Sequence, residues 1–173
     1  MESEADWICM VDNDMSVPLD LLDTLKGVPV DAEIVVPRFY LWDQSKPAIT
    51  LCWGMPLGTK GTAIRENNRE TWKMEPGFHE LTKCGTGVIF IHRKALEKIP
   101  YPWFKYTYDI DQKMTGTEDI QFCYAAKEAG VKMYGNSNIS VGHYHQVDLM
   151  VVANHFIDKS FIDTKEPEGV SST

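Results

Sequence analysis

The chain has 173 residues, which is enough for one domain with its own hydrophobic core. Its formal net charge is −8, and an acidic chain is repelled by the phosphates of nucleic acids and anionic membranes. We therefore expect no nucleic-acid partner, and a phosphorylated ligand would need a bridging cation. The four cysteines, at positions 9, 52, 84 and 123, form no C-x-x-C pair, so we expect reduced and mostly buried thiols.

The amino terminus begins with a strand pattern. Residues 1–4 (MESE) are acidic where a secretory signal would be basic, and no apolar run approaches the ~20 residues of a membrane helix. We therefore expect a cytoplasmic protein with no membrane span. Residues 7–11 (WICMV) form a short apolar run that predicts a buried strand of an α/β sheet. A helical pattern of leucines follows, with Pro18 near its start and Gly27 at its end.

The middle of the chain predicts strands around a long loop. Residues 32–41 indicate a strand, in which Pro37 favours an edge position or a bulge. Residues 49–53 indicate another short strand. Residues 54–77 are rich in glycine, proline and polar side chains, and a loop of this length is usually functional or mobile.

The second half alternates strands and helices. Residues 88–91 predict a strand and residues 93–99 a short helix. The segment at 115–118 (TGTE) fits a capping box before a helix over 120–129, which Gly130 ends. The remaining expected elements are strands at 131–134 and 139–141, a helix at 147–160 and a flexible tail at 165–173. The alternation predicts an α/β protein with a mixed sheet flanked by helices, in a single domain over residues 1–164.

Asp12-Asn13-Asp14 follows the first predicted strand and is the first candidate for a binding site. Open α/β sheets bind ligands at strand ends, and paired carboxylates suit a hard cation such as Mg²⁺ or Mn²⁺. Alone, this D-x-D motif is also compatible with a plain acidic turn before a helix, with Ser16 as its N-cap.

A calcium loop is a second alternative for the same segment. Positions 12, 14, 16, 20 and 23 carry oxygen-bearing side chains in the register of an EF-hand. Val17 stands where that loop needs glycine, and Asp23 where it needs a bidentate glutamate. The strand pattern before Asp12 also argues against the helix that an EF-hand requires.

Two later segments carry further ionisable residues. Glu118 and Asp119 lie at the start of a predicted helix, where acids suit the helix dipole or where one would serve as a general base. His143 and His145 follow the last predicted strand on one face of an extended segment, and imidazole is a ligand for Mn²⁺-like ions. Partly exposed histidines with no ligand are the alternative for this pair.

The order of these motifs resembles the GT-A glycosyltransferases, especially the family 2-like enzymes. The segments that carry the resemblance are WICMVDNDMSVPLDLL, KCGTGVIFIHRKALEKI, GTEDIQFCYAAKEAGVKMYG and ISVGHYH, which together span residues 6–146. The resemblance implies a Rossmann-like GT-A sheet and the metal-dependent transfer of a sugar from a UDP- or GDP-sugar donor to an acceptor hydroxyl. The cofactor would be Mn²⁺ or Mg²⁺.

The resemblance also implies roles for individual residues. Asp14 would bind the metal that holds the diphosphate, and Asp12 the ribose or the metal through water. His143 would complete the metal site, with His145 as the alternative. Asp119, with Glu118 beside it, would act as the base. The remaining candidates are Gly85, Thr86 and Gly87, which would let the backbone approach the sugar, and Trp103 with Phe104, which would stack on a sugar ring or belong to the core.

The position of the D-x-D motif departs from the family. Only eleven residues precede Asp12, whereas family members carry most of their nucleotide-binding half before this motif. We therefore expect a truncated GT-A fold, a minimal transferase, or a missing half that another chain supplies; the alternative function is a non-catalytic sugar-binding module or a subunit of a split transferase. A strand near the amino terminus would leave an uncovered sheet edge, which predicts a homo-oligomer.

Overall fold

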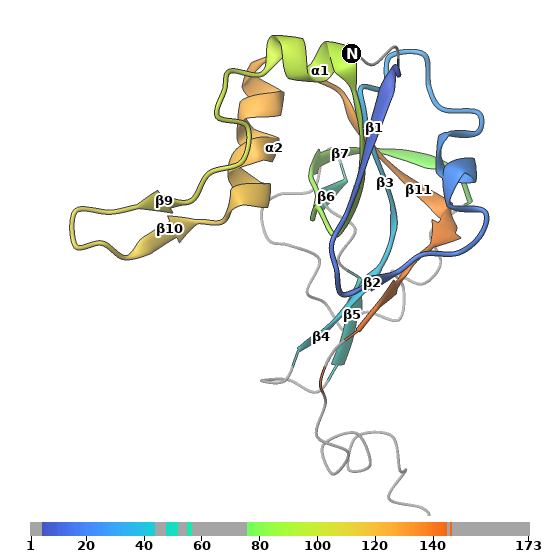
Figure 1. Cartoon of the computed structure of the whole chain (residues 1–173), viewed down its shortest axis with the longest axis horizontal. Coiled ribbons are helices and arrows are strands. Elements are labelled where there is room, and N and C mark those ends of the chain that lie inside the picture. Colours follow the sequence, from blue (N-terminus) through green and yellow to red (C-terminus); the bar gives the residue numbers. More distant parts are fainter. Residues whose placement is uncertain (1–4, 44–47, 52–54, 57–75, 145, 147–173) are drawn as a thin grey trace, which may run out of the picture.

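The computed structural model describes residues 5–43, 48–51, 55–56, 76–144 and 146. A mixed six-stranded sheet, in the order β1-β8-β3-β11-β7-β6, forms its centre (Figure 1). These strands are β1 (Trp7–Val11), β3 (Ile34–Arg38), β6 (Met55–Pro56), β7 (Phe78–Lys83), β8 (Val88–His92) and β11 (Met133–Ser140). Only β3 and β11 pair in parallel, and the other neighbours are antiparallel. The structure is therefore a mixed α/β fold, as the alternating patterns predict.

Shorter elements surround this sheet. The helices are α1 (Arg93–Lys98), α2 (Glu118–Glu128) and the 3₁₀ helix η1 (Leu21–Leu25). Three two-stranded pairs complete the described structure: β2 (Met15–Ser16) with β12 (Gly142–His143), β4 (Tyr40–Asp43) with β5 (Ala48–Leu51), and β9 (Thr107–Tyr108) with β10 (Met114–Gly116). Figure 1 shows α1 and α2 on one side of the sheet and η1 on the other. No helix in the described part of the chain is long and apolar enough to span a bilayer.

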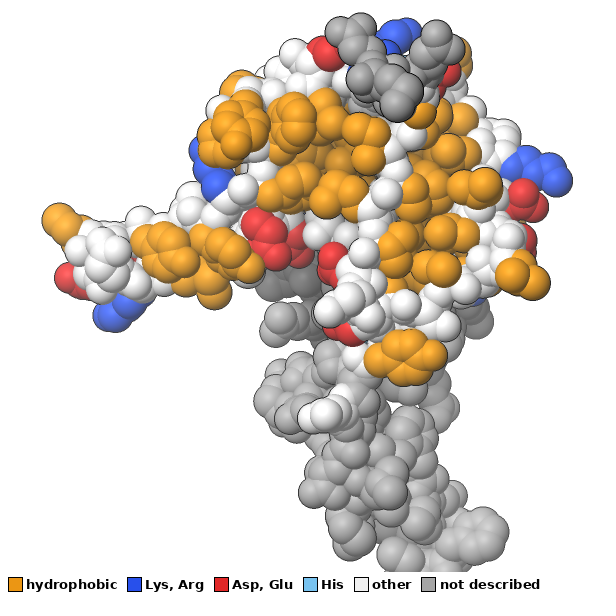
Figure 2. Space-filling view, viewed as in Figure 1, with side chains coloured by type: hydrophobic (Ala, Val, Ile, Leu, Met, Phe, Trp, Pro, Cys, Tyr) orange, Lys and Arg blue, Asp and Glu red, His pale blue; other side chains and the backbone are white. Residues whose placement is uncertain are grey.

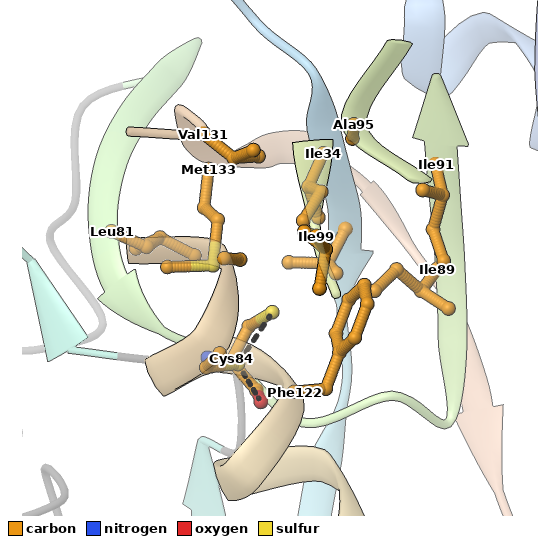
Figure 3. Close-up of a cluster of buried hydrophobic side chains, with 13 residues drawn as sticks. Ile34, Leu81, Cys84, Ile89, Ile91, Ala95, Ile99, Phe122, Val131 and Met133 are labelled. Atoms are coloured by element: carbon orange, nitrogen blue, oxygen red, sulfur yellow. Dashed lines mark hydrogen bonds between the residues drawn. The ribbon is translucent and has the colours of Figure 1, made fainter. Parts of the chain in front are cut away.

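Strand alternation divides the core into two layers. Ile34 of β3 and Ile89 of β8 face the helices, where they meet Phe122 and Ala126 of α2 (Figure 3). Val35 and its neighbours on β8 face the opposite layer, which the leucines of η1 cover. Helix α2 is thus held to the sheet by one buried face, and this fixes the position of its amino-terminal end.

Several sequence predictions need correction. The helix expected from Pro18 is only the 3₁₀ turn η1, since a segment this short gains little from helical nucleation. Strand β3, which contains Pro37, lies in the sheet interior and not at an edge. The bulge alternative is confirmed instead, because the pairing with β11 shifts register directly after Pro37.

Two strands expected at 131–134 and 139–141 are one continuous strand, β11. Strand β7 and the β9–β10 hairpin were not predicted, because their alternation is short and interrupted by glycine or charged residues. The helix expected at 147–160, the tail at 165–173 and most of the loop at 54–77 lie outside the described residues.

The first strand and the cysteines also differ from expectation. Strand β1 is not buried: it is the outer strand of the sheet and pairs with β8 alone among the described strands. Cys84 and Cys123 are buried as expected, with 3.8 Å between their sulfurs, but Cys9 on β1 is exposed.

Candidate functional site

The D-x-D segment turns the chain from β1 into β2. The backbone N–H of Asp12 donates to the carbonyl of Gly87 at 2.8 Å, and the N–H of Met15 donates to the carbonyl of Asp12 at 3.2 Å. The first bond ties the motif to the loop that precedes β8. The segment is therefore a strand–turn–strand unit and not the helix–loop–helix of an EF-hand.

Pairing of β2 with β12 brings His143 to this turn. Gly142 lies opposite Ser16, and a Cβ built at Gly142 would stand 3.1 Å from the Cβ of Ser16, so glycine permits the close approach. The N–H of Tyr144 donates to the carbonyl of Asp14 at 2.8 Å. As a result, Nε2 of His143 lies 3.2 Å from Oδ2 of Asp14, although 129 positions separate the two residues.

His143 is held by its surroundings. Its side chain is 12% exposed, whereas the carboxylate of Asp14 is 49% exposed. The rings of His143 and Phe39 make an edge-to-face contact, with 6.1 Å between their centroids. This is an oriented imidazole beside a solvent-accessible carboxylate, and binding of a ligand by His143 stays a prediction. His145 lies outside the described residues.

The start of α2 supplies the second pair of acids. Asp119 accepts hydrogen bonds at Oδ1 from the hydroxyl of Thr117 and from the N–H of Ile120, the latter at 2.7 Å. The predicted capping box is wrong: Thr115 belongs to β10, and the N-cap is Thr117, whose side chain makes no capping bond. Both bonds reach Oδ1, so Oδ2 of Asp119 has no hydrogen-bond partner in the described part of the chain.

Glu118 has a partner that sequence reasoning missed. The hydroxyl of Tyr106 hydrogen-bonds to the Glu118 carboxylate, and this bond, with the charge of Glu118, raises the pKa of Tyr106. The phenol therefore stays protonated and donates. The signal that predicts this arrangement is the alternation of tyrosines at 106 and 108 before a polar turn, which is typical of a hairpin strand.

The pKa of Asp12 reflects the acidic groups around it. Partial burial raises its pKa most, and the negative charges of Asp14, Glu118 and Asp119 raise it further. The charge of His143 acts in the opposite direction. The acids at the start of α2 therefore act on the turn after β1, and a divalent cation would offset this negative charge.

The donor set can be tested against a metal. In the described part of the chain, no three His, Cys, Asp or Glu side chains are placed to hold one ion. Asp14 and His143 nevertheless offer an oxygen and a nitrogen 3.2 Å apart. Mg²⁺ in enzymes that act on phosphates is commonly bound by one or two carboxylates, with substrate phosphates and water completing the shell. Two protein ligands with a diphosphate co-ligand thus fit this chemistry.

The remaining predicted residues lie at different places. Gly87 is buried and packs against Met15. A Cβ added at Gly87 would stand 3.1 Å from the Met15 sulfur, so glycine permits this close packing beside Asp12. Gly85 and Thr86 are half-buried in the same loop. Trp103 packs against the core and donates its indole N–H to the carbonyl of Ile99 at 3.1 Å.

Phe104 has a clear structural role. Its ring stacks on Phe122, with 4.4 Å between ring centroids. Phe104 therefore belongs to the core layer under α2, as the alternative to sugar stacking proposed. Sugar stacking by Trp103 stays a prediction.

The structure defines a mixed α/β protein with an acidic, histidine-containing site where β1 ends. No protein-family model matches the chain, and a search of curated proteins finds no match. Among solved structures, the fold is similar to the crystal structure of A197 from STIV, with 20% sequence identity and a TM-score of 0.51. The match covers 82% of this chain and 59% of that chain, so this chain spans less than two thirds of the other's length. At this identity the likeness bears on the fold alone.

Proposed function

We propose that this protein is a metal-dependent glycosyltransferase that moves a sugar from a nucleotide-sugar donor to an acceptor hydroxyl. The observation that supports the proposal is that three motifs lie close enough to act on one another. Asp14 and His143 lie 3.2 Å apart, and the charges of Glu118 and Asp119 reach Asp12. A purely structural domain gains nothing from gathering these like charges, because their mutual repulsion lowers stability.

The residues divide into two groups by the roles we assign them. Asp14 and His143 would hold the cation, with Asp12 beside them at the ribose or at a metal-bound water. The cation would be Mn²⁺ or Mg²⁺, and it would neutralise the departing diphosphate as a Lewis acid. A bound cation would also explain how an acidic protein binds a diphosphate.

Asp119 is the candidate base. Two hydrogen bonds hold its Oδ1, which orients the carboxylate and leaves Oδ2 for the acceptor hydroxyl. Glu118 interacts with the hydroxyl of Tyr106, so it is better suited to position the acceptor than to accept a proton. A base must lie within hydrogen-bond reach of the hydroxyl that it deprotonates, so the acceptor hydroxyl would lie at the first turn of α2.

Calorimetric titration of UDP- and GDP-sugars, with and without Mn²⁺, tests the donor site. We expect binding that requires Mn²⁺ and disappears in Asp14→Ala and in His143→Ala. Asp23→Ala removes an exposed carboxylate from η1 and serves as the control with unchanged binding. Nucleotide-sugar binding that is indifferent to Mn²⁺ would refute the proposal.

Release of free nucleoside diphosphate tests catalysis separately. Turnover that disappears in Asp119→Ala, while donor binding persists, is expected of a base. Donor binding without turnover in the unmodified protein would favour the second candidate function, a sugar-binding module or a subunit of a split transferase.

An exposed sheet edge favours that second candidate. On β1, Ile8 is 42% exposed, Met10 39% and Val11 44%. Figure 2 shows a broad hydrophobic area over the part of the molecule where Figure 1 places β1. Apolar patches of this kind mark sites of protein contact. A second polypeptide, either another copy or a different chain, would complete the sheet at β1.

A further inference from the structure

The β9–β10 hairpin projects away from the sheet and carries apolar side chains that the core does not use (Figure 1). Tyr106 is 50% exposed, Tyr108 57% and Met114 56%. Figure 2 shows hydrophobic side chains along this arm and acidic side chains where the arm meets the body. An exposed apolar surface of this kind on a projecting element suggests a binding role.

The hairpin register places two of these side chains on one face. Tyr108 lies directly opposite Met114, so their side chains share a face. Tyr106 directly precedes β9 and is exposed as well. Thr107 and Thr115 occupy the other face, where their hydroxyls hydrogen-bond at 3.1 Å. We call the exposed side chains of Tyr108 and Met114, together with that of the preceding Tyr106, the tyrosine face.

Local contacts hold the β9–β10 hairpin in a defined conformation. At its tip, Oδ1 of Asp109 accepts hydrogen bonds from the N–H groups of Asp111 and Lys113, each at 2.9 Å. At its base, a Cβ on Gly116 would clash with the side chain of Gln121 on α2. The base therefore lies directly on the helix that carries Glu118. A preorganised surface of this kind loses less conformational entropy when a ligand binds.

The tyrosine face begins at the candidate site. Thr107, next to Tyr106, pairs with Gly116, and α2 begins two residues after Gly116, so this end of the hairpin adjoins the acids at the start of α2. Tyr108 and Met114 continue along the hairpin, away from the end that adjoins α2. The face thus leads outward from the candidate base.

We infer that the tyrosine face binds the sugar rings of a neutral oligosaccharide acceptor whose terminal hydroxyl reaches Asp119, an inference that rests on the proposed transferase function. A sugar ring has an apolar C–H face that packs on an aromatic ring and hydroxyl edges that bond to carboxylates. Residues 105–119 carry four acids and two lysines, a net charge of −2, which disfavours phosphate-bearing partners. A protein partner is the competing occupant.

Binding of neutral tetrasaccharides in the absence of donor tests the inference. The probes are cellotetraose, chitotetraose and mannotetraose, followed by saturation-transfer NMR and calorimetry with the full chain. We expect at least one probe to bind, and Tyr108→Ala to weaken it roughly tenfold, the scale of one lost aromatic contact. Tyr108→Phe keeps the ring and retains binding within about twofold. Tyr124→Ala, an exposed tyrosine within α2, leaves binding unchanged.

Parallel titration of UDP- and GDP-sugars with Mn²⁺ separates this inference from the proposed function. Tyr108→Ala is expected to bind donor as the unmodified protein does. Donor binding without binding of any tetrasaccharide at millimolar concentration would overturn the inference and leave the transferase proposal standing. Tetrasaccharide binding that depends on Tyr108, without metal-dependent donor binding, would support the tyrosine face and refute the transferase proposal.

Two further outcomes would overturn the inference. One is tetrasaccharide binding that Tyr108→Ala leaves unchanged. The other is self-association that Tyr108→Ala abolishes in light scattering while the unmodified protein binds no tetrasaccharide, since the face would then be a protein contact.

Discussion

Replacing Asp12 with asparagine separates the stability of the site from its function. Asp12 lies in the field of Asp14, Glu118 and Asp119, and its pKa is raised by burial and by these charges. A raised carboxyl pKa means that the ionised form is less favourable in the folded chain than in the unfolded chain. Stability therefore falls as the pH rises through that pKa, and at neutral pH the Asp12 charge lowers the free energy of unfolding.

The size of the effect follows from the exposure of the group. The side chains involved are exposed or half-buried, so solvent screens each repulsion to several tenths of a kcal/mol. His143 offsets part of the sum when protonated. We expect Asp12→Asn to stabilise the metal-free protein by about 0.5–1.5 kcal/mol. For a chain of this length, that raises the melting temperature by about 2–5 °C.

Thermal unfolding, followed by circular dichroism in EDTA and then in Mn²⁺, measures the change in melting temperature that Asp12→Asn causes. In EDTA the variant should melt above the unmodified protein, and the difference should shrink as salt is raised. In Mn²⁺ the order should reverse, because the intact acidic site gains more from the cation. Asp111→Asn, at the tip of the hairpin, makes the same charge change away from the cluster and should leave the melting temperature nearly unchanged. A variant that is less stable than the unmodified protein in EDTA would refute the electrostatic reasoning.

Three other changes test the packing and the sheet edge. Phe122→Ala should lower the free energy of unfolding by about 3–5 kcal/mol in urea titration, while Tyr124→Ala changes it by less than about 0.5 kcal/mol. Gly116→Ala should cost less than about 1 kcal/mol, because an added Cβ would meet the ends of the Gln121 and Thr107 side chains, which can move aside, and Gln121→Ala should recover part of that small loss in the double variant; a loss of about 3 kcal/mol would contradict this reasoning. In light scattering at micromolar concentration we expect a mass above 19.7 kDa that Met10→Lys reduces; a clean monomer before substitution would count against association through β1.

Local patterns predicted the elements whose signals lie within the chain itself. Residues 88–91 and 93–99 read as strand and helix because a short apolar run is followed by helical spacing, and β8 and α1 occupy those positions. Gly130 ends α2 with a φ of 71°, a conformation that glycine adopts without a Cβ penalty. Such signals depend on neighbouring residues and need no knowledge of the rest of the fold.

Elements that depend on distant partners were predicted less well. Strand β1 has an apolar sequence typical of a buried strand, yet it is the outer strand, because burial depends on which strands pair with it. Strand β3 tolerates Pro37 in the sheet interior because β8 pairs with only Ile34 and Val35, so the proline needs no donor on that side.

The candidate site shows the same division. The order of the motifs, through its resemblance to the GT-A glycosyltransferases, indicated Asp12, Asp14, Asp119 and His143, although each motif alone also has a structural explanation. Only the tertiary structure decided that Asp14 and His143 touch, through the pairing of β2 with β12. The same is true of Tyr106, whose pKa Glu118 raises, because the pairing of β9 with β10 ends next to the start of α2. Residue types determine which chemistry is available, whereas contacts between segments far apart in the chain determine which of those groups act together.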